Sequence, residues 1–394
     1  MRVQNGRLVA LVAAVAVAAV TGGGALAWRQ GPQANAEADA APLSSSPTTA
    51  TSTPTKTPTP TAKPTPAPSS TPSSIPSTKP TVGPVKTKID LKKLTTGRTP
   101  QITYLSGRTI RGGAGEDVKV PGTTDIQEVA RLGGSSLAVV TKGFGNEMLT
   151  IDSEGNVTRR TPDITQIVTT DDGSAAAYAG TKRKDTGEET AGATIYAEQA
   201  EGQGGLQKIT VPDIWNTTLE AYVNGKVYFD ASTAQDGPSA LYEWTPGESK
   251  AALLKSIPSA LAVSSTGTAG SLTTLADQSS CSSLLTVPAG KRLWRTCDYM
   301  ITGFTPDGAT VIGGSKYQDG YGDGIAVVLD AKNGSLLHEW SGVFRQAIPE
   351  DDQHLLLLAD DGDETPASIV RCTITTGACE LATPLAKGQL LIGA

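Results

Sequence analysis

The sequence predicts an all-β domain over residues 98–394, a seven-bladed β-propeller closed by strands from both ends of that region. Two observations carry this prediction. Short apolar segments recur about every 43 residues, which is the usual length of one four-stranded blade. The region is also rich in Gly and β-branched residues, a composition typical of many short strands joined by tight turns. A pair of β-sandwiches is the alternative, because short alternating strands suit both architectures.

An apolar segment stands near the start of the chain. Arg2 and Arg7 precede residues 8–28, which carry no charge and are long enough for a helix that crosses a bilayer. Because positive residues are retained in the cytoplasm, we expect residues 1–7 inside the cell and the rest of the chain outside it. The sequence thus predicts a single-pass protein of the cell membrane with an extracytoplasmic C-terminal domain.

The same apolar segment has a second interpretation. It is rich in Ala and Val, and small residues at Ala25 and Ala27, and again at Ala34 and Ala36, provide possible cleavage sites for a signal peptidase. The alternative to the anchor is therefore a cleaved signal peptide and a secreted product.

A disordered linker is predicted over residues 29–97. Residues 41–88 hold 12 of the 25 Pro residues, many Thr and Ser, and no Asp or Glu. Such a composition cannot bury enough apolar surface to fold, and repeated Thr-Pro pairs favour extended polyproline conformations. We expect a spacer that holds the folded domain away from the membrane.

The repeat is defined by apolar segments that precede a turn and further strands. The interval after the second segment is longer than the others because residues 181–192 form an extended hairpin loop. The segments comprise residues 125–129, 164–168, 214–215, 257–261, 300–304 and 343–348.

The two ends of the domain each hold an incomplete unit. Residues 389–392 supply one strand, whereas residues 101–105, 109–111 and 117–120 supply three. Since a lone strand leaves its edges unpaired, we expect the C-terminal strand to join the three N-terminal ones in a seventh blade.

One turn carries a family resemblance. Residues 304–312, with Thr305, Pro306, Asp307 and Gly308, resemble the hairpin signature of bacterial exported TolB-like and WD-repeat-like β-propellers. Residues 169–175 and 348–354 are weaker copies. The resemblance implies a propeller fold, but the Gly-His and Trp-Asp pairs of true WD repeats are absent from the sequence.

Four Cys residues form two local pairs. In an exported protein an even number of Cys residues favours disulfides. Cys281 and Cys297 are equally far from a central turn, and Cys372 and Cys379 flank a second turn in the same way. Of the three possible connectivities we expect these two local bridges.

Catalytic motifs are scarce. The sequence contains no nucleophile elbow, no phosphate-binding loop and no zinc-protease helix. His338 and His354 are its two histidines, and we expect both to be structural because neither has a nucleophile or metal-ligand spacing beside it.

Two acidic loops are candidate sites. The first offers aromatic and carboxylate side chains for ligand binding at Tyr317, Asp319, Tyr321 and Asp323. The second offers carboxylate oxygens for a metal, with Ca²⁺ as the possible cofactor, at Asp360, Asp361, Asp363 and Glu364.

The charge balance limits the classes of partner. The net charge is −6 and the isoelectric point is near 5.2, which argues against nucleic acid as a partner. We expect a monomeric binding or sensing propeller, without a required cofactor, that presents loops to a protein or glycan partner in the cell envelope. The alternative is a propeller enzyme, hydrolase, lyase or quinoprotein-like, with its site in the central funnel.

Overall fold

The computed structural model describes residues 85–200, 204–275, 280–316, 323–361 and 366–393. These residues belong to one compact unit. Within them, no helix is long and apolar enough to cross a membrane. The apolar segment at residues 8–28, predicted as an anchor or signal peptide, and most of the predicted linker lie outside the described residues.

The described residues form six β-sheets, five with four antiparallel strands each and one with eight strands. The five smaller sheets are β28 (Leu390–Ile392) with β2 (Tyr104–Ser106), β3 (Thr109–Arg111) and β4 (Val118–Lys119); β5 (Ile126–Leu132), β6 (Ser135–Lys142), β7 (Gly145–Ile151) and β8 (Val157–Pro162); β9 (Ile164–Thr169), β10 (Ala175–Arg183), β11 (Glu189–Gln199) and β12 (Gln207–Val211); β13 (Trp215–Val223), β14 (Lys226–Ser232), β15 (Ser239–Trp244) and β16 (Ala252–Pro258); and β17 (Ala260–Val263), β18 (Thr268–Thr274), β19 (Ser280–Thr286) and β20 (Arg292–Thr296).

The eight-stranded sheet consists of two four-stranded halves that share one long strand. The N-terminal part of this strand pairs with the first half and its C-terminal part pairs with the second, with the change of partner near Gly342. The strands are β21 (Tyr299–Phe304), β22 (Thr310–Ser315), β23 (Asp323–Asp330), β24 (Leu336–Pro349), β25 (His354–Asp360), β26 (Ala367–Thr373) and β27 (Cys379–Leu381), and β1 (Val85–Lys88) pairs with the side of β24.

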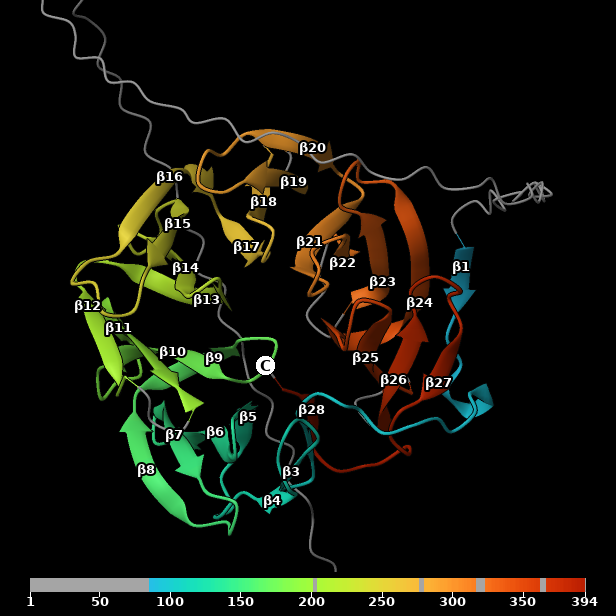
Figure 1. Ribbon diagram of the computed structural model, residues 1–394, viewed down its shortest axis with the longest axis horizontal. Helices are drawn as coiled ribbons and strands as arrows, with labels where there is room; N and C mark the ends of the chain where they lie inside the picture. Colours follow the sequence, from blue (N-terminus) through green and yellow to red (C-terminus); the bar gives the residue numbers. More distant parts are fainter. Residues whose placement is uncertain (1–84, 201–203, 276–279, 317–322, 362–365, 394) are drawn as a thin grey trace, which may run out of the picture. The chain divides into compact units, whose positions relative to one another are not determined.

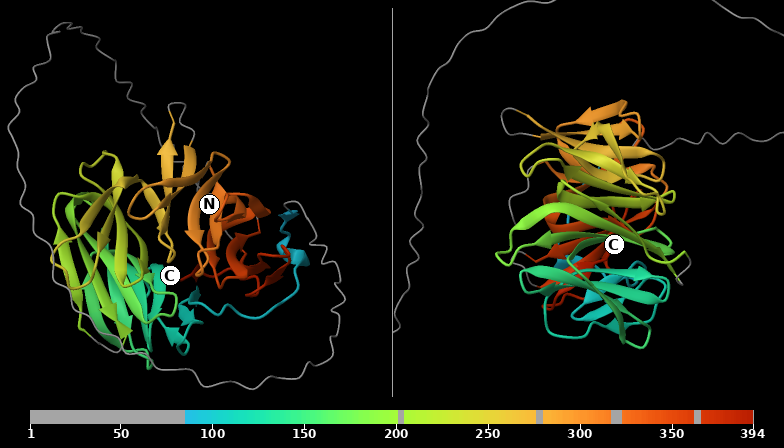
Figure 2. Two further views of the ribbon diagram at one scale, coloured as in Figure 1. Left: turned by 45° about the horizontal axis from the view of Figure 1, so that its top comes forward. Right: turned by 90° about the vertical axis from the view of Figure 1, so that its left-hand side faces the viewer.

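The sheets are arranged radially in a ring, with the first strand of each unit near the centre and the fourth at the rim (Figure 1). Figure 2 shows the ring from two further sides. The recurring apolar segments predicted from the sequence lie on these first strands or at their starts, so the predicted repeat is confirmed. The predicted hairpin at residues 181–192 also joins two strands, but β10 and β11 extend into it and only residues 184–188 connect them.

Burial explains the sequence pattern of the strands. β6, a middle strand, has five consecutive buried residues because neighbouring sheets cover both of its faces. β8, an outer strand, alternates between partly buried and exposed residues over most of its length because solvent reaches one face. An almost continuous apolar run therefore marks a middle strand, and alternation marks an outer one.

The core lies between the sheets. Within the described residues, seven apolar clusters each join two consecutive four-stranded units. One of them joins the last half of the large sheet to the sheet of β28 and contains Tyr104, Leu356, Ile369 and Ile392. This cluster closes the ring by apolar burial.

Backbone pairing between the chain ends completes the closure. β28 pairs antiparallel with β2, with Tyr104 opposite Ile392 and Ser106 opposite Leu390. The predicted unit built from both ends of the domain is thereby confirmed. The C-terminal strand provides the innermost strand of the sheet that the N-terminal strands complete.

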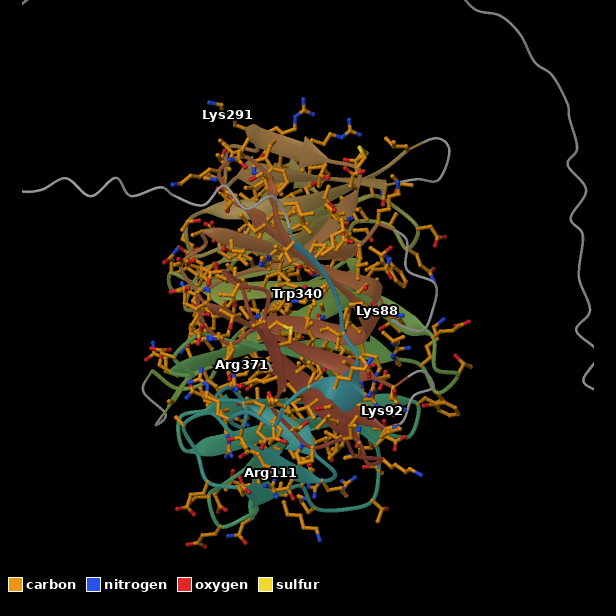
Figure 3. All side chains as sticks on the ribbon, turned by 90° about the vertical axis from the view of Figure 1, so that its right-hand side faces the viewer. Lys88, Lys92, Arg111, Lys291, Trp340 and Arg371 are labelled. Carbon is orange, nitrogen blue, oxygen red and sulfur yellow. A yellow bond between two sulfur atoms is a disulfide. The ribbon has the colours of Figure 1, made fainter. Side chains whose placement is uncertain are left out.

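The predicted domain boundary at residue 98 requires correction, because residues 85–88 already form a strand that pairs with the propeller. We call residues 85–101 the strap. Its strand β1 runs parallel to the outer half of β24, and a short 3₁₀ helix, η1 (Leu91–Lys93), follows. Thr96 forms a parallel bridge with Leu381, so the strap covers the outer edges of two neighbouring units (Figure 3). The Pro-rich run that ends at Pro84 stops just before the strap. The side chain of Leu91 holds the strap against the propeller through an apolar cluster.

Both predicted disulfides are present. Cys281 is bonded to Cys297, and Cys372 is bonded to Cys379. Each bridge joins neighbouring strands or their ends within one sheet, as the spacing about the turns predicts.

Candidate functional site at the centre of the ring

Adjacent first strands are connected by side chains that reach the backbone of the next unit. The Ile167 amide donates a hydrogen bond to Glu128 Oε2 at 2.7 Å, and the Leu219 amide donates to Gln166 Oε1 at 2.7 Å. Gln346 Oε1 accepts from the Ile392 amide at 2.8 Å. These bonds satisfy edge groups that neighbouring sheets do not pair, and they hold the first strands around the axis.

The first strands end in turns that the sequence signature encodes. Asp307 Oδ1 accepts a hydrogen bond from the Ala309 amide at 2.9 Å, and Asp172 Oδ1 accepts one from the Ser174 amide at 2.9 Å. Gly308 and Gly173 follow with φ of 65° and 66°, a conformation that favours glycine. Hydrogen bonds from Ser174 and Thr170 lower the pKa of Asp172 to about 2. The copies in two units therefore have the same geometry.

Turns of neighbouring units also contact one another. The Asp307 amide donates to Asp352 Oδ1 at 2.8 Å, and Ser265 Oγ donates to the Pro306 carbonyl at 2.7 Å. The Gly133 amide donates to the Gly173 carbonyl at 2.9 Å. The turns thus form a connected layer at one end of the ring.

Two adjoining cavities lie where this layer meets the first strands. They measure about 480 and 350 Å³ and share part of their lining. Residues that line both are Thr169, Asp171, Pro306, Ile348 and Pro349. The smaller cavity is lined by parts of β9, β13, β17, β21 and β24 and therefore lies at the centre of the ring.

Two carboxyl groups line the smaller cavity without a partner. Asp171 and Glu220 form no hydrogen bond or ion pair with any described residue. Burial raises the pKa of Asp171, and the nearby Asp172 and Asp352 carboxylates raise it further. The pKa of Glu220 lies well above its usual range because of burial and the Asp230 carboxylate.

A third carboxyl group, that of Asp230, lies near Glu220. Asp230 is buried, accepts a hydrogen bond from the Ala260 amide at 3.1 Å, and also has a raised pKa because of burial. The Asp230 carboxylate thus disfavours ionisation of Glu220. Carboxyl groups with raised pKa values in a central cavity are typical of functional positions. The sequence analysis missed them, because isolated acidic residues inside strands carry no recognisable motif.

Four-stranded units arranged radially around their first strands are the defining feature of a β-propeller. This domain is a β-propeller.

Comparisons with known proteins give only low similarity. No protein-family model matches the chain, and no curated protein matches it. Among solved structures, the propeller is similar to TolB from Acinetobacter baumannii, with 14% identity, a TM-score of 0.44, and coverage of 69% of this chain and 66% of that one. The sheet topology itself is the propeller fold that the TolB-like resemblance of the sequence implies.

Two further solved structures show the same degree of similarity. The β-propeller domain of the Trilobed protease from Pyrococcus furiosus has 12% identity, a TM-score of 0.47, and coverage of 68% of this chain and 86% of that one. An uncharacterised protein of Listeria monocytogenes has 10% identity, a TM-score of 0.47, and coverage of 71% and 91%. These likenesses are too weak to transfer a function to this propeller.

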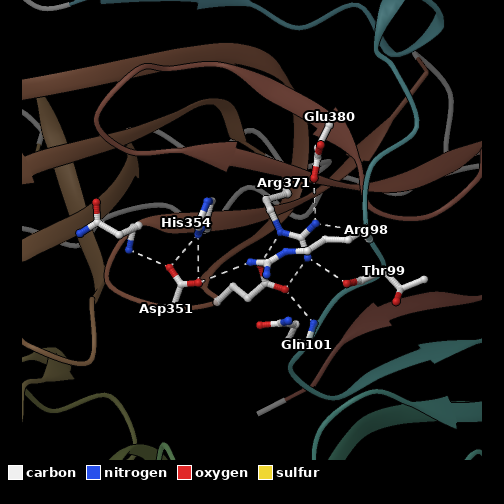
Figure 4. A network of polar contacts seen from close by, with 9 residues as sticks. Arg98, Thr99, Gln101, Asp351, His354, Arg371 and Glu380 are labelled. Atoms are coloured by element: carbon white, nitrogen blue, oxygen red, sulfur yellow. Dashed lines mark hydrogen bonds and ion pairs between the residues drawn. The ribbon is translucent and has the colours of Figure 1, made fainter.

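A second polar cluster surrounds Arg371 on β26 (Figure 4). Arg371 and Glu350 form a buried ion pair through two hydrogen bonds, with Nη2 at 2.6 Å from Oε1. Nη1 donates to the Arg98 carbonyl at 2.7 Å and Nη2 donates to the Thr99 carbonyl at 2.9 Å. The Gln101 amide donates to Glu350 at 2.7 Å. The cluster therefore clamps the end of the strap onto the propeller.

The same cluster has the residue types of a metal site. Ligand atoms of Glu350, Asp351 and His354 lie within 4.8 Å of one another. Both oxygens of Glu350 already accept hydrogen bonds from Arg371, and the guanidinium of Arg98 lies 3.6 and 3.7 Å from carboxylate oxygens of Glu350 and Asp351. Two guanidinium groups at these oxygens supply the positive charge, so the arrangement is that of an ion-pair network.

Both histidines lie in local packing contacts. His354 Nδ1 is 2.9 Å from Asp351 Oδ1 in a turn. His338 is buried edge-on against Trp340, and burial lowers its pKa. These surroundings agree with structural roles for both rings.

The predicted ligand loop lies largely outside the described residues. Tyr317, Asp319 and Tyr321 are among the residues left undescribed. Asp323 is the first residue of β23, and its side chain is also left undescribed. The binding role of this loop remains a prediction.

The predicted Ca²⁺ loop is described in part. Asp360 is buried and pairs with Arg345, with Oδ2 2.8 Å from Nε, and Asp361 Oδ2 lies 2.8 Å from Lys92 Nζ. Asp363 and Glu364 lie outside the described residues. Calcium binding at this loop remains a prediction and requires these carboxylates to exchange their cationic partners for the ion.

Proposed function

We propose that this chain is an extracytoplasmic binding or sensing propeller of seven blades, tethered to the membrane through its N-terminal segment, that binds a glycan in its central cavity. The observation that carries the proposal is the pair of carboxyl groups, Asp171 and Glu220, that line one central cavity without partners among the described residues. Glu220 is partly buried and Asp171 is exposed, so both carboxyl groups are accessible to a ligand that enters the cavity.

The lining of the cavity suits a polyhydroxylated ligand. Hydroxyl groups stand among apolar side chains, which suit the mixed polar and apolar faces of a sugar ring. A raised pKa favours the protonated form of a carboxyl group, which can both accept and donate hydrogen bonds. The hydroxyl-bearing residues are Thr169, Tyr222, Ser264, Ser265, Thr302 and Thr305.

Two parts of this proposal, the number of blades and the membrane tether, go beyond what the structure describes. Five four-stranded sheets together with the two halves of the eight-stranded sheet support seven blades. The uncharged segment at residues 8–28 and the Pro/Thr-rich linker that follows support a tether or an export signal. A protein partner at the loops is the other occupant that this architecture suits.

The same carboxyl groups favour one enzymatic alternative. Glycoside hydrolases use two carboxyl groups that flank the scissile bond, one with a raised pKa that serves as the acid. Asp171 and Glu220 share a cavity and both have raised pKa values. A hydrolase in the central cavity is therefore the second candidate.

Binding and hydrolysis are separable in one experiment. The full-length chain would be titrated with oligosaccharides of N-acetylglucosamine and N-acetylmuramic acid by isothermal calorimetry, and released reducing ends would be measured in parallel. We expect Asp171→Asn and Glu220→Gln each to weaken binding at least tenfold, and Asp236→Asn, at an exposed carboxylate, to leave it unchanged. Release of reducing ends that both cavity variants abolish supports the hydrolase. Equal affinity of all variants overturns the proposed site.

A further inference from the structure

Positive charge is concentrated in one sector of an acidic protein. The whole chain has 33 Lys and Arg against 39 Asp and Glu. Between residues 249 and 297, by contrast, five cations stand with one acidic residue, Asp277, which lies outside the described residues. The cations are Lys250, Lys255, Lys291, Arg292 and Arg295.

These cations lie on or beside the outermost strands of two neighbouring blades. β16 and β20 follow one another along the rim of the ring in Figure 1. Ser256 Oγ on β16 donates a hydrogen bond to the Pro288 carbonyl at 2.7 Å, so the turn before β20 rests on β16. Lys291 projects at the rim in Figure 3. We call this sector the basic rim.

The cations of the basic rim are exposed and uncompensated. All five residues are exposed, and none of their side chains forms a hydrogen bond or ion pair with a described residue. Elsewhere on the propeller, some exposed cations, such as Lys86 and Lys184, have carboxylate partners. The basic rim therefore keeps its positive potential available to a partner.

β20 holds its two arginines in a fixed relation. Arg292 pairs opposite Leu285 and Arg295 opposite Ser283, two residues apart on β19, so both arginines project from the same face of the sheet. Trp294 Nε1 donates to the Ala331 carbonyl at 2.8 Å, and the disulfide from Cys297 follows the strand. This anchoring lowers the entropic cost of ordering the strand around a ligand.

Like β4, β8, β12 and β16, β20 is an outermost strand whose outer side pairs with no described strand, whereas the strap pairs with β24 and β27. The free backbone amides of β20 stand beside the guanidinium groups, and amide and guanidinium donors together are the groups that bind phosphate oxygens.

We propose that the basic rim binds a linear polyol-phosphate polymer. A phosphodiester chain repeats its negative charge along a flexible backbone, which matches cations spread along two strands, and Arg suits phosphate through paired donors. Nucleic acid is a poorer match, because binding of single strands depends on exposed aromatic platforms. The aromatic residue of β20, Trp294, is instead partly buried and bonded to the next blade.

The test compares the full-length chain with two charge-matched variants. Lys291, Arg292 and Arg295 would be changed together to Gln, and the control would change exposed cations on other blades, Lys182, Lys208 and Lys332, together to Gln. The probe is a synthetic glycerol-phosphate oligomer, with binding followed by fluorescence anisotropy over a range of salt concentrations. The Lys residues of the linker are identical in all three proteins and cancel in the comparison.

We expect the basic-rim variant to lose at least tenfold in affinity and the control less than twofold, with unchanged circular dichroism and melting temperature. The slope of log K against log salt should fall by about 2, since each lost phosphate contact removes roughly 0.7. Equal losses in both variants, no binding by the unaltered chain, or tighter binding of an oligothymidylate of the same phosphate number would each overturn the proposal. So would self-association of the basic-rim variant with unchanged polymer affinity, because the charges would then protect only a strand edge.

Discussion

The guanidinium of Arg371 forms a buried ion pair with the carboxylate of Glu350 and, at the same time, donates to the backbone carbonyls of Arg98 and Thr99. Arg371 lies near the C-terminus of the propeller and the two carbonyls lie in the strap. One side chain thus connects the last blade to the segment through which the chain enters the ring, in addition to the pairing of β28 with β2.

Removal of one partner from this pair should be costly. We expect Arg371→Met to lower the free energy of unfolding by about 3–5 kcal/mol, because the buried Glu350 carboxylate loses its hydrogen-bonded cation and keeps only the guanidinium of Arg98 at 3.6 Å. The double variant with Glu350→Gln should recover part of the loss. Urea unfolding of each protein measures this, with Arg111→Met, at an exposed ion pair, expected within about 0.5 kcal/mol of the unaltered chain. A double variant no more stable than the single one would contradict this explanation.

The strap should contribute to stability through Leu91. This side chain is buried in the cluster that also contains Trp340 and Phe344. We expect Leu91→Ala to lower the unfolding free energy by about 2–5 kcal/mol. It should also speed hydrogen exchange of the β1 amides that pair with β24, whereas Lys93→Ala, at an exposed site, should change neither. Unchanged exchange in the Leu91 variant would show that the strap is held without this contact.

Glu128 should make stability depend on pH. Burial raises its pKa from 4.5 to about 7, while the hydrogen bond from the Ile167 amide opposes the shift. Below pH 4.5 the carboxyl group is protonated in both the folded and the unfolded chain. As the pH rises towards 7 the unfolded chain loses this proton first, so stability falls by up to about 3 kcal/mol and then levels off.

Glu128→Gln isolates this effect and keeps the acceptor for the Ile167 amide, as Gln166 does for the Leu219 amide in the next blade. We expect the variant to be more stable than the unaltered chain at pH 8 and equally stable at pH 4.5. Thermal melts at the two pH values, with Glu116→Gln at an exposed site as the control, provide the measurement. A variant that is less stable at pH 8 would refute the protonation argument.

Ring closure should depend on Ile392. It is buried in the cluster that joins the last half of the large sheet to the sheet of β28, and its backbone pairs opposite Tyr104. We expect Ile392→Ala to cost about 2–5 kcal/mol and to speed hydrogen exchange in β2. Leu206→Ala, at an exposed apolar residue, should change stability by less than about 0.5 kcal/mol. Slow exchange in β2 of the Ile392 variant would mean that closure does not rest on this side chain.

Several features of the fold could be predicted from local sequence patterns. The spacing of apolar segments, the turn at Pro306-Asp307-Gly308 and the position of each Cys about a turn are encoded within a few tens of residues, and the structure confirms the repeat, the turn and both bridges. The terminal pairing also followed from counting strands, because an unpaired strand is unstable wherever it lies.

Other features depend on residues that are distant in the chain. The sequence by itself determined the all-β class, the repeat, the closure and the disulfides, since these follow from periodicity and from the need to pair every strand. The tertiary structure alone decided that residues 85–88 pair with the propeller, that Arg371 meets Glu350 and the strap, and that Asp171 and Glu220 line one cavity. Such contacts bring together blades that the chain visits far apart, and no local preference of Asp, Glu or Arg specifies which of them become neighbours.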